Sequence, residues 1–382
     1  MSNLEETLKN VRVALSENDA KRALKLLKPF KKSLSSENSN NLILKQVYAE
    51  AYLEHGQLEK AYPILVSCCE MDPTGTSGGC DKFFTLGQII GGKDGLEVMQ
   101  KGIDNISIIK EMTKEHTEKI VSGLLSMIEI WMTDLCMEPN AESECEQLIT
   151  NAMGISSESS PEAWLTLGSI RISQQRFSDA TNAFTQAWKY FEIKKNEAGK
   201  AALDNGAPTH EEYAEMLQPL SSLAKMCMEV GLYDVALKVE NAIKDIDEDN
   251  LEGYYLEGFT NYLICKIETF KVQNPNIDLT PENIYEFNQH IQEIPLQLEN
   301  EAIAEPLHEA RVALSFAKRL GDNIDSKDEV ANELVSGTVA LLGEIGGPVS
   351  DEELQQLRKG VAVDGEIDEE IDIEYLSEDD GN

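Results

Sequence analysis

The segment PEAWLTLGSIRISQQRFSDATNAFTQAWKYF, residues 161–191, places small and bulky apolar residues at the intervals that two closely crossing helices require. These residues are Trp164, Leu167 and Gly168 in the first half, then Phe177, Ala180, Phe184 and Ala187 in the second half. Glycine lets two helix axes approach closely, because any larger side chain would hold them apart, and bulky residues fill the space beside the crossing. The spacing therefore predicts a helix pair with Gly168 at its crossing.

Similar spacings recur in other parts of the chain. KFFTLGQII repeats the opening with Phe83, Leu86 and Gly87, and AEAYLEHGQLEKAYPILVSCC supplies Ala49, Tyr52, Gly56, Ala61, Leu65 and Cys68. LAKMCMEVGLYDVALKV supplies Ala224, Gly231, Tyr233 and Ala236, and ALSENDAKRALKLLKPF supplies Ala23, Leu27 and Phe30. EGYYLEGFTNYL and EARVALSFAKRLG predict the two helices of an interrupted last pair, through Gly258, Ala310, Leu314 and Ala317.

A two-helix repeat of about 34 residues with this pattern is typical of tetratricopeptide repeats. One such pair cannot bury its apolar face alone, so neighbouring pairs must stack. We therefore predict an all-α, tetratricopeptide-like solenoid of six or seven helix pairs over residues 1–345, with an insertion at 271–300 inside the last pair. Residues 346–360 are expected to form a linker and a short helix, which Ser350 and Glu353 would cap reciprocally.

The composition changes at the end of the chain. Residues 361–382 contain ten acidic residues and no lysine or arginine. Such a segment repels itself and is expected to be disordered when unbound. Apolar residues interleave with the acids, which predicts contact with a basic and partly apolar partner through Ile367, Asp368, Glu369, Glu370, Ile371, Asp372, Ile373, Tyr375 and Leu376.

Charge is the most informative property of the whole sequence. The 69 acidic and 33 basic residues give a formal net charge of −36. This charge disfavours nucleic acid and anionic membranes and attracts cationic partners, although it could also serve solubility alone. No apolar run approaches the roughly 18 residues of a membrane span, and the start MSNLEETLKN lacks the features of a leader. Seven cysteines without metal spacing indicate reduced thiols of the cytosol or nucleus.

Catalytic motifs are absent from the sequence. GQIIGGKD, residues 87–94, matches a phosphate loop up to Lys93, but Asp94 replaces the Ser or Thr that would hold magnesium. Gly87 is also already used by the repeat pattern. The five histidines are scattered, without paired ligand spacing. We therefore expect a protein that is not an enzyme and has no cofactor and no metal site.

The sequence resembles the fungal assembly chaperone dedicated to large-subunit ribosomal protein four. The features that carry this resemblance are the helix-pair array, the strong negative charge, the late insertion and the tail of acids and isoleucines. The resemblance covers essentially the whole chain. It implies that the protein captures this newly made basic client and shields the client's basic internal loop from aggregation and RNA. It further implies delivery to nuclear pre-60S particles, and thus a place in both cytoplasm and nucleus.

A solenoid of this kind binds partners in the concave surface lined by the first helix of each pair. Projecting first-helix positions onto that surface selects Glu50, Glu54, Asp81, Asp134, Glu138, Glu162, Glu252 and Tyr255 as client-binding candidates. The expected partner is a basic ribosomal protein, with no direct nucleic acid or membrane contact and a monomeric free state. A general scaffold or cochaperone adaptor remains an alternative, and an acidic histone chaperone a further one.

Overall fold

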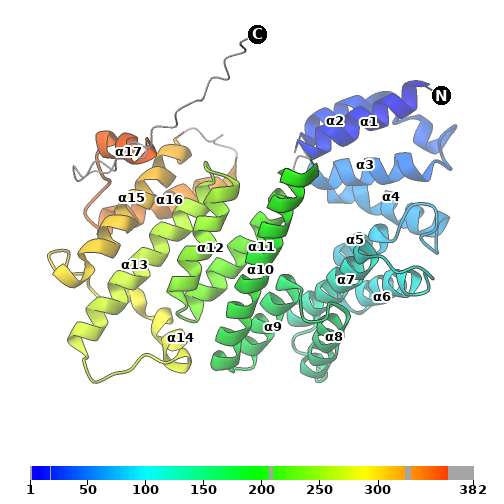
Figure 1. The fold of residues 1–382 in the computed structure, drawn as a ribbon. Coiled ribbons are helices and arrows are strands. Elements are labelled where there is room, and N and C mark those ends of the chain that lie inside the picture. Colours follow the sequence, from blue (N-terminus) through cyan, green and yellow to red (C-terminus); the bar gives the residue numbers. More distant parts are fainter. Residues whose placement is uncertain (1, 18, 206–209, 323–327, 360–382) are drawn as a thin grey trace, which may run out of the picture. The chain divides into compact units, whose positions relative to one another are not determined.

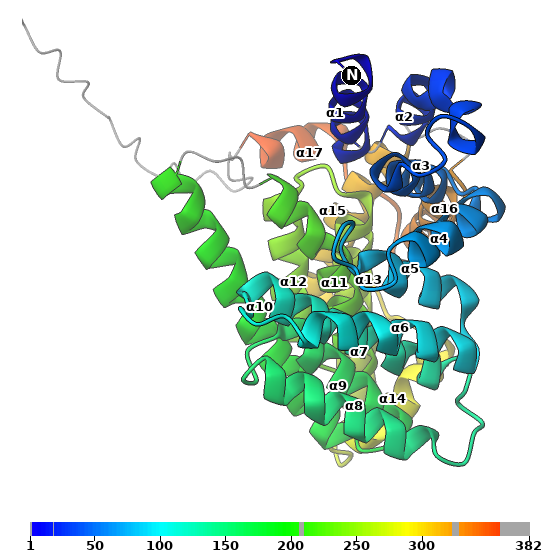
Figure 2. The ribbon, with the colours of Figure 1, turned by 90° about the vertical axis from the view of Figure 1, so that its right-hand side faces the viewer.

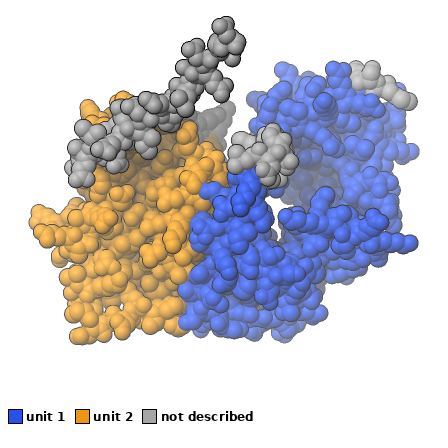
Figure 3. All heavy atoms as spheres, in the orientation of Figure 1, with its two compact units in different colours: residues 1–219 blue, residues 220–382 orange. Residues whose placement is uncertain are grey.

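A computed structural model describes residues 2–17, 19–205, 210–322 and 328–359 of the 382-residue chain. Within these residues there are 17 α-helices and four short 3₁₀ helices, and no strand (Figure 1). Contacts divide the chain into two compact units, residues 1–219 and 220–382 (Figure 3). The prediction of an all-α, tetratricopeptide-like fold is confirmed. The sequence predicted one array over 1–345 and suggested no boundary at residue 219.

Unit 1 consists of helix pairs that stack in chain order. Its helices are α1 (Ser2–Ser16), α2 (Ala20–Leu27), α3 (Leu42–Glu54), α4 (Leu58–Met71), α5 (Asp81–Ile90), α6 (Gly92–Ser107), α7 (Lys114–Met132), α8 (Ala141–Ile155), α9 (Pro161–Ser173), α10 (Phe177–Asn205) and the first part of α11 (His210–Glu229), with 3₁₀ turns at Lys28–Phe30 and Ser33–Ser35. From α1 to α10, each helix packs against the next one (Figure 2). The first helices of successive pairs also touch, as α5 touches α7 and α7 touches α9. This is the contact pattern of a helix-pair solenoid.

The close crossing predicted at Gly168 is present. A Cβ atom at this position would overlap the ring of Phe184, so α9 and α10 could not pack as they do with any other residue there. Ala180, Phe184 and Ala187 are all 0% exposed. Trp164 is half-buried and donates its indole N–H to the carbonyl oxygen of Glu158 at 2.8 Å, and Leu167 packs on the neighbouring core.

Two glycines that the repeat pattern selected have a different role, in turns. Gly56 and Gly231 adopt φ angles of 67° and 77°, in the left-handed region that glycine enters without strain. Each ends the first helix of a pair, and the following N–H bonds to a carbonyl five residues earlier, as Gln57 does to Tyr52. Gln175 adopts the same conformation, with φ 59°, in the turn between α9 and α10.

Unit 2 contains the end of α11 and the helices α12 (Tyr233–Ile246), α13 (Leu251–Gln273), α14 (Pro281–Gln289), α15 (Ala304–Gly321), α16 (Glu329–Glu344) and α17 (Asp351–Arg358), with 3₁₀ turns at Ile291–Glu293 and Glu301–Ile303. The two helices predicted for an interrupted last pair are α13 and α15, which pack extensively on each other. A Cβ at Gly258 would overlap Leu314, which repeats the crossing of Gly168 and Phe184.

The insertion between α13 and α15 packs back on unit 2. Its helix α14 begins at Pro281 after a Thr280 cap, as the sequence predicted. Ile284 lies directly over Gly231, where a Cβ would overlap it. Asn288 donates to the carbonyl of Met228 at 2.9 Å and accepts from the Tyr233 hydroxyl at 3.0 Å. The insertion therefore covers the turn that joins α11 to α12.

A buried lysine anchors α16. Lys266 of α13 is 1% exposed, and its Nζ lies 2.6 Å from Glu344 and 2.5 Å from the carbonyl oxygen of Ile294. The Tyr262 hydroxyl donates to the other oxygen of Glu344 at 2.8 Å. Because burial of an ammonium requires compensating acceptors, Glu344 and Ile294 complete the coordination that water would otherwise supply.

The short helix predicted after residue 346 is α17. Ser350 caps it by accepting the N–H of Glu353 at 3.2 Å. The predicted reciprocal bond is wrong, because the Glu353 carboxylate lies 3.5 Å from His308 of α15 instead. The tail residues Asp368, Glu369, Glu370, Ile371, Asp372, Ile373 and Tyr375 lie outside the described residues.

Candidate client-binding surface

The structure places the eight client-binding candidates on several different elements. Glu50 and Glu54 lie on α3, Asp81 begins α5, Glu162 lies in the first turn of α9, and Glu252 and Tyr255 lie on α13. The assignment of Asp134 and Glu138 to a first helix is wrong, because α7 ends at Met132 and both residues lie in the loop before α8. Their role in client binding stays a prediction.

Three of the candidate acids that lie on helices are paired with lysines of neighbouring helices. Lys119 of α7 lies 2.9 Å from Asp81, and Lys194 of α10 lies 2.6 Å from Glu162. In unit 2, Lys225 of α11 lies 2.6 Å from Glu252. These pairs are partly exposed, so each contributes little to stability. They do mean that a basic client would compete there with the chain's own lysines.

The loop that carries Asp134 and Glu138 closes over the start of α6. Asp134 accepts the N–H of Gly92 at 2.8 Å, and Glu138 lies 3.1 Å from Lys93. A carboxylate is favoured at this place because the N–H groups at a helix N-terminus are unpaired and partly positive. The segment that resembled a phosphate loop is thus joined to carboxylates of its own chain. Gly87 serves the crossing with α6, where a Cβ would lie 2.8 Å from the Gly95 carbonyl oxygen.

Glu50 and Glu54 differ from the other candidate acids. Both are exposed on α3, and no ion pair to either of them is present among the described side chains. Their spacing of four residues places them on the same side of that helix. Of the predicted acids, these two therefore offer carboxylates that a cationic partner could approach without displacing a lysine. Burial raises the pKa of Glu50, and the charge of Arg12 opposes that shift.

Tyr255, which was predicted to face the concave surface, is partly enclosed by neighbouring side chains and by α16. Its ring stacks on Phe259, with centroids 6.2 Å apart and planes 7° apart. A Cβ at Gly337 of α16 would lie 3.1 Å from the Tyr255 ring, so α16 approaches it closely. Burial raises the pKa of Tyr255, with the nearby charge of Glu333 adding to the shift. Its ring is thus in part a packing residue between α13 and α16.

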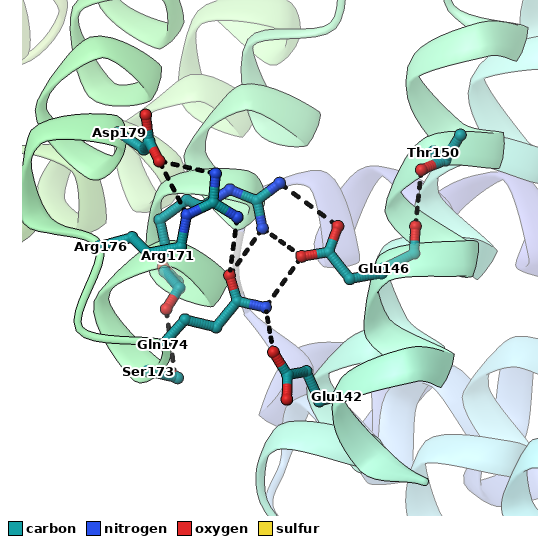
Figure 4. Close-up of polar contacts among 9 residues, drawn as sticks. Glu142, Glu146, Thr150, Arg171, Ser173, Gln174, Arg176 and Asp179 are labelled. Atoms are coloured by element: carbon teal, nitrogen blue, oxygen red, sulfur yellow. Dashed lines mark hydrogen bonds and ion pairs between the residues drawn. The ribbon is translucent and has the colours of Figure 1, made fainter.

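A polar network that the sequence did not predict joins α8 to the turn after α9 (Figure 4). Arg171 stands where the repeat consensus has a tyrosine, and its guanidinium contacts both carboxylate oxygens of Glu146. Gln174 accepts from Arg171 at 2.8 Å and donates to Glu146 at 2.8 Å and to Glu142 at 3.1 Å. The hydrogen bonds from Arg171 and Gln174 hold the pKa of Glu146 below its ordinary value despite partial burial.

A cleft of about 530 Å³ with a mixed polar and apolar lining, which no sequence pattern indicated, lies among α6, α7 and α8. Its lining includes Ile103, Ile120, Leu124, Met127, Trp131 and Leu148, with Gln100, Glu144, Gln147 and Asn151 among its polar residues. None of the predicted client-binding residues lines this cleft.

The described residues show no grouping of three or more His, Cys, Asp or Glu side chains that could hold a metal ion. All seven cysteines are free thiols. Among the described helices, none combines the length and the apolar character that crossing a bilayer would demand.

The chain is similar in sequence to known proteins. Residues 249–372 match the family model of the ACL4 C-terminal domain. A protein of Emericella nidulans named "Probable assembly chaperone of rpl4" is 29% identical over 268 residues, which cover 68% of this chain and 65% of that relative. A protein of Schizosaccharomyces pombe with the same name is 27% identical over 270 residues, covering 69% of this chain and 75% of the relative. The chain thus spans about two thirds of the length of the Emericella relative.

A solved structure shows the same fold. The structure named "Assembly Chaperone of RpL4 (Acl4) (Residues 1-338)" superposes with a TM-score of 0.51 at 24% identity, covering 69% of this chain and 97% of the other. The resemblance inferred from the helix pairs, charge and tail is confirmed by the family model and the two relatives over the residues that they cover, and the solved structure supports the fold.

Proposed function

We propose that this chain, whose relatives are named as assembly chaperones of rpl4, is itself a dedicated chaperone of that ribosomal protein. The observation that carries the proposal is the match of residues 249–372 to the ACL4 C-terminal domain together with the two relatives. The client's basic internal loop would be shielded from RNA and from aggregation until delivery to nuclear pre-60S particles. The function is binding rather than catalysis.

Electrostatics supports this assignment. The net charge of −36 attracts a basic client over long distances, and such steering acts mainly on the association rate. Salt screens exposed charges beyond about 8–10 Å at physiological ionic strength. We therefore expect the association of purified rpl4 to slow markedly between low and physiological salt, measured by stopped-flow fluorescence. Association that does not respond to salt would remove charge from the mechanism.

Two double variants of equal charge change test where the client's cations bind. Glu50→Gln/Glu54→Gln removes unpaired carboxylates, whereas Glu162→Gln/Glu252→Gln removes carboxylates already paired with Lys194 and Lys225. Both should slow association equally, because both change the net charge by two. The first variant should also speed client dissociation, because its carboxylates are free to contact the client. Equal dissociation rates would show that these acids act through net charge alone.

The tail, residues 361–382, is proposed as a second client contact that is tethered close to the first. Truncation after Gly360, and a full-length variant with Ile367, Ile371, Ile373, Tyr375 and Leu376 changed to Ser, should both release rpl4 faster. If the serine variant retains rpl4 as the unaltered chain does while truncation weakens retention, charge alone acts there. If neither variant weakens it, the tail is not a client site.

A pulldown of the tagged chain, read by mass spectrometry, separates this function from its alternatives. Enrichment of rpl4 alone supports the proposal, whereas heat-shock chaperones would indicate a cochaperone adaptor and histones a histone chaperone. We also propose that the free chain is monomeric and occurs in cytoplasm and nucleus, which light scattering and microscopy of a tagged chain would test.

A further inference from the structure

One residue of unit 2 departs from a rule that the other helix pairs obey. In the second helix of each pair, a large side chain follows a buried small residue by four positions, as Leu27 follows Ala23 and Phe184 follows Ala180. At this position six pairs have an apolar residue, each at most 4% exposed: Leu27, Leu65, Met99, Ile149, Phe184 and Leu314. The pair of α11 and α12 has Glu240, which is 0% exposed.

Only one of the two carboxyl oxygens of Glu240 has a hydrogen-bond partner among the described residues. Its Oε1 accepts the hydroxyl of Thr260 on α13 at 2.6 Å. Its Oε2 is buried and has no hydrogen-bond partner among the described residues. An ionised carboxylate in such a place would lack the solvation that water or a cation provides, so the neutral acid is strongly favoured.

Among the residues that the structure describes, the charged and titratable groups around Glu240 do not supply a counter-ion. On α11, the thiol of Cys227 is buried, and that burial raises its pKa. On α13, Glu257 is a second negative charge, and it holds Lys244 of α12 in an ion pair at 2.5 Å. Burial raises the pKa of Glu240 to about 8, while the Thr260 hydrogen bond and Lys244 oppose the shift and Glu257 adds to it.

We propose that Glu240 is a proton-operated switch, whose neutral carboxyl closes the packing of α11, α12 and α13 and whose ionisation loosens it. A raised pKa in the folded state means that the stabilising contribution is complete below the ordinary value of 4.5 and is lost as pH rises toward about 8. Above that pH the folded state carries the charge and no further loss follows. The switch lies within unit 2 and does not depend on the proposed client.

The test is chemical unfolding of the full chain between pH 5.5 and 9, compared with Glu240→Gln. The amide introduced by this substitution would keep an acceptor for Thr260 but cannot ionise. One proton bound preferentially by the folded state changes the folding equilibrium constant about tenfold per pH unit. We expect the unaltered chain to lose stability relative to Glu240→Gln by this factor per unit up to about pH 8, with no further divergence above. Parallel curves for the two proteins would overturn the proposal.

Two further variants keep the test decisive. Glu240→Met introduces a methionine, the residue type that Met99 supplies at the same position in the pair of α5 and α6. This variant should show a flat pH dependence even if the glutamine variant folds poorly. Glu257→Gln removes a carboxylate at the same crossing that is already ion-paired, and it should keep the pH dependence but shift its upper end to lower pH, because the Glu257 charge adds to the raised pKa of Glu240. Hydrogen exchange should place the loosening in residues 227–263, with unit 1 peptides as the internal reference. Loosening in both units alike would overturn the assignment to Glu240.

Discussion

Two helix pairs cross in the same way although the segments that connect their helices differ greatly. They are the pair of α9 and α10 and the pair of α13 and α15. In the first pair, residues 174–176 join the helices, and Gly168 meets Phe184. In the second pair, residues 274–303 intervene with a helix of their own, and Gly258 meets Leu314. The small and large residues thus specify the crossing, and the connection between the helices can vary.

The two crossings should break in the same way when the glycine is enlarged. Gly168→Leu and Gly258→Leu each force a side chain into space that Phe184 or Leu314 occupies, and overpacking costs roughly 1–3 kcal/mol, occasionally more. Denaturant unfolding of each variant measures the loss.

Gly154→Leu and Gly343→Leu are the matched controls, one in each unit. Both glycines are helical and exposed, and nothing lies within 4 Å of a Cβ built on either. These variants should stay within about 0.5 kcal/mol of the unaltered chain, because both glycines lie in the last turn of a helix and an exposed substitution there touches no packed residue. A crossing variant as stable as its control would contradict the role given to that glycine.

The polar contacts that join these pairs to neighbouring helices differ more than their crossings do. One is the ion pair of Lys266 on α13 with Glu344 on α16, and the other is the network of Arg171 and Gln174 with Glu146 on α8. Lys266 is buried and Glu344 is 43% exposed at its side chain, so removing either partner has a different consequence. Glu344→Ala leaves a buried ammonium without its carboxylate and should cost about 2–3 kcal/mol, below the roughly 3–5 kcal/mol typical of fully buried pairs. Lys266→Met leaves a carboxylate that water can reach, and it should cost less. Thermal unfolding of both variants measures this order, and the reverse order would contradict it.

The smallest effect is expected at the link of α9 to α8. Arg171 and Gln174 lower the pKa of Glu146 in the folded state, so their contribution is present above its ordinary value of 4.5 and is lost as pH falls through the lowered folded value. Arg171→Leu should cost about 1 kcal/mol at neutral pH, since the pair is partly exposed. Unfolding between pH 2.5 and 6 should show the two proteins converging as pH falls, and curves that stay parallel would rule the link out.

Local spacing made much of this fold predictable. Gly168 with Phe184, and Gly258 with Leu314, were identified because small and large residues recur at helical intervals. Helix starts such as Thr280-Pro281 are equally local, because an N-cap and a proline act within one turn. The resemblance to a known family came from the combination of that array with charge and tail composition.

The sequence by itself determined the helical class, the helix pairs and the crossings, because small and large side chains recur along each helix with the 3.6-residue period, even where an insertion separates the two helices of a pair. Only the tertiary structure decided which charges are free. Asp81, Glu162 and Glu252 look like any exposed acid in the sequence, and their lysines belong to other helices, 38, 32 and 27 residues away. Glu240 stands at a repeat position where the other pairs have an apolar residue, but only the tertiary structure shows that its carboxyl group is buried and that one oxygen has no partner among the described residues.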